Sequence, residues 1–216
     1  MSEQDSFITE VSDEVRRDRL FKFFRRYGWI AASLVVVIVA GAAIFEWQRA
    51  QAAAEAQAAG DAILAALEAD GPAARSDALA ALEVSDNANR GALIALMQAD
   101  AALEQGERDT ALGLLQGLAD DADLPVAYRD LATLKWTING AGDVSPDERI
   151  SRLEGIALGA GAFRLIALEQ IALAEVERGN TEAALANLSD IINDAGVTQD
   201  LRARALQLIV ALGGEP

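Results

Sequence analysis

The chain of 216 residues contains no cysteine and no histidine. Their absence excludes disulfide bonds, thiol nucleophiles, covalent haem attachment, histidine general bases and the usual zinc ligands. The phosphate-binding and nucleophile patterns G-x-x-x-x-G-K-[ST], G-x-G-x-x-G and G-x-S-x-G are also missing. Adjacent acids such as Asp120 and Asp121 are typical of a solvated helix face. We therefore expect no catalytic residue, cofactor or metal ion, and interpret the protein as non-enzymatic.

Basic residues are scarce in the larger part of the chain. Residues 46–216 carry twelve bases and twenty-eight acids, a net charge of −16. A surface this acidic repels phosphate backbones and anionic lipid headgroups. The composition predicts no nucleic acid partner and leaves basic proteins and unfolded clients as candidate partners.

Charged residues are absent from Trp29 to Phe45, within the apolar segment 27–47, YGWIAASLVVVIVAGAAIFEW. As a helix this segment is about 31 Å long, which matches the hydrocarbon thickness of a bilayer. Tyr27 and Trp29 lie at one end and Phe45 and Trp47 at the other, as expected for aromatic belts at two membrane interfaces. A buried core helix is the alternative, but core helices seldom run so long without charge. The segment predicts one transmembrane helix.

Six of the eighteen basic residues cluster immediately before this segment. Residues 16–26 hold six bases and one acid, whereas the twenty residues after Trp47 hold one base and two acids. Positive residues stay cytoplasmic, so we expect a cytoplasmic leader (1–26), a single span in a bacterial inner membrane and a periplasmic C-terminal part. The leader either lies along the inner leaflet or docks a cytosolic partner. The six bases are Arg16, Arg17, Arg19, Lys22, Arg25 and Arg26.

A cleaved signal peptide is the alternative interpretation of the N-terminal region. The apolar region of a signal peptide is about 7–15 residues long, and the apolar run here is longer. The leader before it is also long and of mixed charge. These two features favour a retained membrane anchor.

The segment 48–87 is predicted to be an Ala-rich helical stem followed by a short helix. Residues 48–69 are rich in alanine and contain no proline, which favours a continuous helix. Gly71 and Pro72 end this helix. A short helix is expected over 73–84, with Leu79 and Leu82 on its apolar face.

From residue 88 to 216 the chain repeats itself. When 105–118 is aligned with 178–191, Gly106 falls on Gly179 and Ala111 on Ala184. The offset of 73 residues is about twice the 34-residue period of a tetratricopeptide repeat, plus a few residues. The glycine permits a tight turn and the alanine lets two helices approach closely. Further helices are expected over 126–139, 146–158 and 199–212.

These features predict an all-α fold, with one N-terminal transmembrane helix followed by a tetratricopeptide-like α-solenoid of helix pairs. A generic bundle rich in alanine and leucine is the alternative.

The basic leader EVRRDRLFKFFRRYGW, the span, the Ala-rich stem and the repeat core ERGNTEAAL resemble a bacterial tetratricopeptide-like family, the ancillary Sec translocon subunit or YfgM-like proteins. The chain departs from the repeat pattern at Ala95, Ala102, Leu168 and Glu175, where aromatic residues are usual. The resemblance implies association with the secretion channel and with periplasmic chaperones. The expected function is thus a membrane-anchored periplasmic protein–protein interaction adaptor. A structural or coordinating subunit of a division or cell-wall assembly is the alternative.

In tetratricopeptide repeats the first helix of each pair lines the concave face, which implies a protein-binding groove here. Its residues are Leu93, Leu96, Asp100, Leu103, Glu104, Ile166, Glu169, Leu173, Val176 and Glu177. The basic and asparagine residues with which some repeats hold a peptide carboxylate are absent from these positions. The groove is expected to be aliphatic with an acidic rim, suited to apolar or basic segments. Alternatively, the aliphatic residues pack against neighbouring helices as core.

Overall fold

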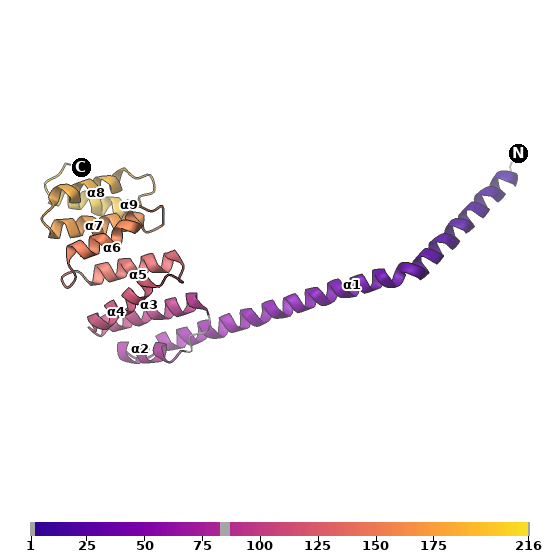
Figure 1. Ribbon diagram of the computed structural model, residues 1–216, viewed down its shortest axis with the longest axis horizontal. Helices are drawn as coiled ribbons and strands as arrows, with labels where there is room; N and C mark the ends of the chain where they lie inside the picture. The colour runs from indigo at the N-terminus through magenta and orange to yellow at the C-terminus, as the bar shows by residue number, and fades with distance from the viewer. Residues whose placement is uncertain (1–2, 83–86, 216) are drawn as a thin grey trace. The chain divides into compact units, whose positions relative to one another are not determined.

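The computed structural model describes residues 3–82 and 87–215, which divide into two compact units, residues 1–61 and 62–216. Every helix or strand that it describes is an α-helix, and the sole β-type pairing among these residues is an isolated bridge between Ala141 and Val144 (Figure 1). The all-helical fold class is therefore confirmed. The structure does not describe the side chains of residues 1–24, 27–28 and 31–32. What was predicted for most of the basic leader and for Tyr27 therefore stays a prediction.

The first unit consists of the greater part of helix α1 (Glu3–Leu67). Every side chain from 33 to 47 is exposed, including Val37 at 66% and Phe45 at 67%. A core helix would bury such residues, whereas a membrane helix presents them to lipid. The structure thus contains a helix near the N-terminus that is long and apolar enough to cross a membrane.

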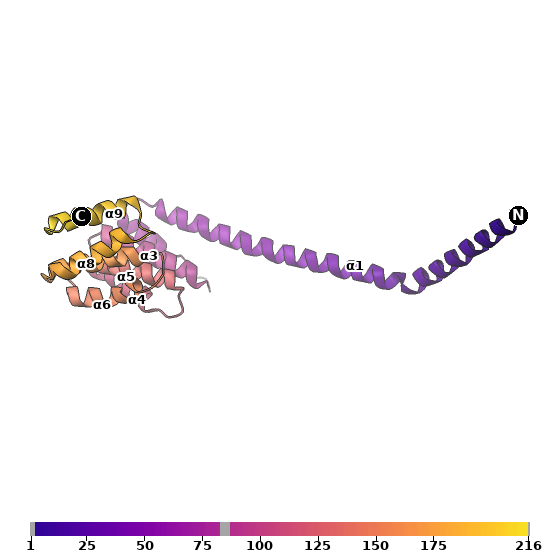
Figure 2. The same ribbon diagram turned by 90° about the horizontal axis from the view of Figure 1, so that it is seen from above.

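The second unit contains the end of α1 and the helices that follow it, packed in chain order (Figures 1 and 2). From α2 to α9, each helix packs against its neighbours along the chain, and the contact between α5 and α6 is the least extensive of these. The helices are α2 (Pro72–Ala80), α3 (Ala88–Glu104), α4 (Arg108–Asp120), α5 (Val126–Asn139), α6 (Pro146–Ala157), α7 (Arg164–Glu177), α8 (Thr181–Asn193) and α9 (Gln199–Ala211).

The core of this unit is a succession of apolar clusters. Ile63 and Ala66, from the end of α1, meet Leu79 of α2 and Ile94 of α3. The next clusters join α3 to α5, α5 to α7, and α7 to α9. Because consecutive clusters share a helix, each helix is held mainly by its neighbours, as in helical arrays.

Helices α3 and α7 each end in a turn of the same type. Gly106 and Gly179 adopt left-handed conformations, with φ of 78° and 76°. The Glu107 N–H donates to the Ala102 carbonyl at 2.9 Å, and the Asn180 N–H makes the equivalent 2.9 Å bond. This is the Schellman arrangement, in which glycine takes a conformation that a side chain would strain. The tight turn predicted at each of the aligned glycines is confirmed.

Each of these turns leads into a helix whose first buried residue is alanine. Ala111 in α4 and Ala184 in α8 are fully buried. Leucines four residues further on, Leu115 and Leu188, are fully buried as well. The small side chain lets the paired helices come close, and the leucine fills the space beyond.

The middle pair, α5 and α6, has a different turn. Gly140 keeps a right-handed conformation at φ −83°, and the left-handed residue is Gly142 at φ 93°. Helix α6 begins after Ser145, whose hydroxyl accepts a bond from the Glu148 N–H at 3.3 Å. The turn is longer than those after α3 and α7.

Helix α6 has a different kind of residue at the first buried position. Leu153 and Ile156 have the spacing of the buried residues in α4 and α8, and the position four residues before Leu153 is Arg149. Arg149 is 2% exposed and pairs with Glu177 of α7. A charged side chain thus lies where the neighbouring pairs have alanine.

Candidate protein-binding surface

The residues expected in a groove on α3 lie at different depths. Leu93 is 39% exposed, Leu103 is half-buried, and Leu96 is only 6% exposed within the core that α3 shares with α4 and α5. Asp100 and Glu104 are exposed. Of the residues predicted on α3, one leucine and two acids are therefore exposed, whereas Leu96 belongs to the core.

The residues expected on α7 divide in the same way. Val176 and Glu177 are exposed, whereas Ile166 and Leu173 are half-buried. Glu169 is buried, and both of its carboxylate oxygens accept bonds from Arg204 of α9, at 2.8 and 2.9 Å. This pairing raises the pKa of Arg204, chiefly through the hydrogen bond. The Glu169 carboxylate therefore links two helices.

The α3 and α7 sets do not meet in one pocket among the described residues, because α5 lies between their helices (Figure 1). Lys135 of α5 bonds Asp100 of α3 at 2.6 Å. Two of the acids expected at a groove rim, Asp100 and Glu169, are thus partners of bases on the next odd-numbered helix. Sequence reasoning missed Lys135 and Arg204, since no local pattern links them to acids about 35 residues away.

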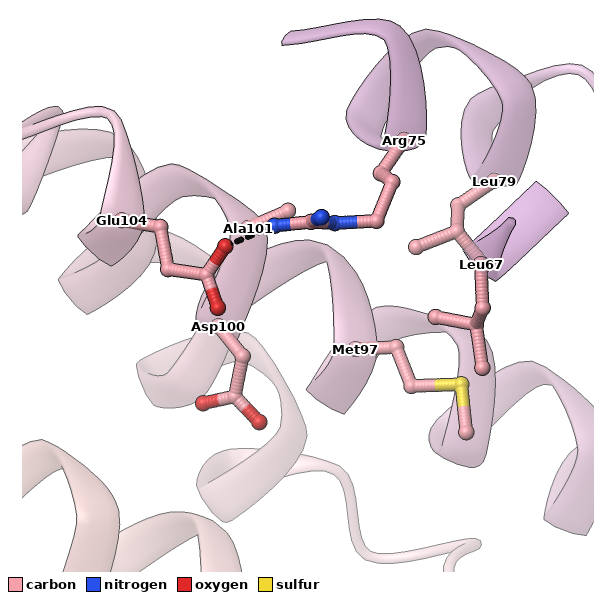
Figure 3. Close-up of a pocket in the computed structure, with 7 residues that line it drawn as sticks. All are labelled: Leu67, Arg75, Leu79, Met97, Asp100, Ala101 and Glu104. Carbon is pink, nitrogen blue, oxygen red and sulfur yellow. Dashed lines mark hydrogen bonds and ion pairs between the residues drawn. The ribbon is translucent and has the colours of Figure 1, made fainter. Parts of the chain in front are cut away.

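The α3 set continues into a hollow of about 120 Å³ formed with α2 and the last turn of α1 (Figure 3). Its floor is apolar and its rim carries charge. The lining residues are Leu67, Arg75, Leu79, Met97, Asp100, Ala101 and Glu104. Asp100 and Glu104 were predicted as binding residues, whereas the contribution of α1 and α2 was not.

The rim of this hollow is held by two ion pairs. Arg75 of α2 reaches across to Glu104 of α3, as Figure 3 shows, and Asp100 is held by Lys135. These charges neutralise one another locally. Since each acid is fixed by a base from another helix, the opening of the hollow is shaped before any ligand arrives.

Around the hollow the remaining charge is acidic. The described residues between 62 and 109 contain seven acids and three bases. Glu68, Asp70 and Asp77, on or next to the elements that form the hollow, are exposed and form no ion pair with any described residue. The region therefore carries a negative potential that attracts basic groups.

A second, more open depression lies at the start of α4 and spans residues 106–110. It is formed by one short stretch of chain, and its side chains are polar or charged. Within the described part of the chain, no three carboxylates lie close enough to hold a metal ion. The hollow at α2 and α3 is the better candidate for binding because it alone of the two combines an apolar floor with walls from separate helices.

Comparison of the chain with protein-family models, curated proteins and solved structures found no match.

Proposed function

We propose that this protein is a membrane-anchored adaptor, in which one helix in the bacterial inner membrane holds a tetratricopeptide-like α-solenoid in the periplasm against partner proteins. The observation that carries the proposal is the pairing, in one chain, of an exposed apolar helix with a separate helical unit that has its own core. Anchoring keeps the helical unit close to membrane partners and raises its effective concentration without new contacts.

The tetratricopeptide-like assignment is supported by the two equivalent turns. Gly106 and Gly179 have the same conformation, and Ala111 and Ala184 the same burial, in helices that pack in chain order. The middle pair departs from the repeat because Arg149 replaces the small residue. A solenoid with this one irregular pair is the arrangement that we propose.

The proposed partners are the Sec translocon and periplasmic chaperones or secretory clients. This part of the proposal rests on the resemblance of the leader, span and repeat core, and the acidic surface adds a preference for basic partners. We assign no catalytic role and no cofactor.

Purification of the full-length chain from membranes in mild detergent tests this function. Enrichment of translocon subunits and periplasmic chaperones over a chain with residues 62–216 deleted is expected. Enrichment of division or cell-wall enzymes instead would support the alternative of a coordinating subunit. Equal recovery with the two chains would contradict the proposal that the helical unit binds partners.

A further inference from the structure

The hollow between α2, α3 and the end of α1 has the size and lining to hold one side chain. At about 120 Å³ it approaches the cavity of about 150 Å³ that binds a benzene-sized ligand in another protein. Leu79 forms its buried floor, and Met97 and Leu67 form apolar walls. Leu67 is 37% exposed, so the apolar lining is reachable from solvent.

The charges around the hollow select among occupants. The unit 62–216 carries eleven bases and twenty-five acids. A second copy of this unit would bring the same excess of acids, and an acidic segment would likewise be repelled. A basic segment gains from the exposed acids Glu68, Asp70 and Asp77, which form no ion pair with any described residue, and the exposed part of Leu67 offers apolar surface at the hollow beside the two rim ion pairs.

We propose that this hollow receives one aliphatic side chain from a basic segment of a partner protein. The inference rests on the proposed adaptor function and specifies where the partner docks and what chemistry it presents. The aliphatic side chain supplies contact area in the hollow, and the flanking lysines or arginines face the surrounding acids. Recognition thus combines one apolar anchor with long-range attraction.

The probe for this proposal is a fluorescent nine-residue peptide with one central leucine among lysines. Its binding to the full-length chain in nanodiscs of zwitterionic lipid is measured by fluorescence anisotropy, alongside peptides that carry alanine for leucine or glutamate for lysine. We expect the alanine peptide to bind about tenfold more weakly and the glutamate peptide not to bind. Equal binding of the leucine and alanine peptides would overturn the proposal.

Two variants on one helix locate the anchor. Leu67→Asp places a charge in the hollow, whereas Leu64→Asp places the same charge one turn earlier, at an exposed residue outside the hollow. We expect Leu67→Asp to abolish the preference for leucine over alanine and Leu64→Asp to keep it. Equal effects of the two variants would contradict the site. If Leu67→Asp lowers the melting temperature, the proposal is still tested by comparing the binding of the leucine and alanine peptides to the unaltered chain.

Failure of this inference is distinguishable from failure of the adaptor function. A chain that recovers its partners from membranes but shows no preference for the leucine peptide is an adaptor with a different docking site. A chain that binds neither partners nor peptide contradicts both proposals.

Discussion

Small buried residues control how closely paired helices approach. Ala184 lies at the contact of α7 and α8 without exposed surface, whereas Ala186, two residues later on the same helix, is exposed. We predict that Ala184→Leu destabilises a fragment spanning 49–216 by about 1–3 kcal/mol, since added methylene groups overpack the contact. Ala186→Leu should leave the melting temperature nearly unchanged. Equal melting of the two variants would mean that the repeat alignment is misplaced.

Two aspartates give opposite pH dependences. The pKa of Asp194 is lowered by the hydrogen bond from the Gly196 N–H, at 2.7 Å, and then by Arg164. The pKa of Asp130 is raised by desolvation, which exceeds the opposing effect of Arg129. The ionised form of Asp194 is therefore stabilised by folding and that of Asp130 is disfavoured.

Melting temperatures measured against pH should separate these contributions. The stability due to Asp194 is present above its unfolded pKa and is lost as the pH falls through its lowered folded pKa. The melting temperature of Asp194→Asn should therefore fall less steeply in acid than that of the unaltered chain. Asp130→Asn should raise stability at neutral pH, and this gain should shrink as acid protonates the native Asp130. The same pH dependence for both variants would contradict these assignments.

At the scale of elements, helix positions follow from the sequence because local signals set them. The expected segment 126–139 is α5, and those over 146–158 and 199–212 differ from α6 and α9 by one residue at the C-terminal end. Apolar periodicity gives each helix, and Pro146 marks the start of α6. The short helix after the stem begins at Pro72 and ends at Ala80, four residues before the predicted end.

The binding surface was less predictable because depth and pairing depend on neighbours far along the chain. The repeat spacing placed Leu93 and Leu96 together, but contacts of α3 with α4 and α5 bury Leu96. The Arg149–Glu177 pair joins residues 28 positions apart on two helices, which the two aligned glycines do not indicate. Sequence periodicity thus identified the helices but not which of their faces are buried by neighbouring helices.

Substitutions on α3 and α7 distinguish core from surface. We predict that Leu96→Asp unfolds the fragment 49–216, because a buried unpaired charge costs several kcal/mol. Leu93→Asp should retain the melting temperature, since Leu93 is solvent-accessible. Leu173→Asp, at a half-buried position, should lower the melting temperature more than Leu93→Asp and less than Leu96→Asp. A folded Leu96→Asp variant would contradict the burial of Leu96.

At the scale of the whole molecule, charge is unevenly distributed along the chain. Residues 16–26, just before the apolar segment, hold six bases and one acid, whereas acids outnumber bases after it, which predicts a cytoplasmic N-terminus. Changing the six bases of residues 16–26 to neutral residues should produce mixed orientations, detected by a compartment-sensitive reporter fused after Pro216. A reporter that stays entirely periplasmic in this variant would refute the charge-based topology.

Site-specific photo-crosslinking in intact membranes tests the adaptor account most directly. A photoreactive residue is placed at Leu93, beside the acidic surface of α3, or at Gln116, an exposed residue of α4. The account predicts crosslinks from Leu93 to translocon subunits or periplasmic chaperones, with lower yield from Gln116. Crosslinks from Leu93 to cytoplasmic proteins, or none above those from Gln116, would contradict it.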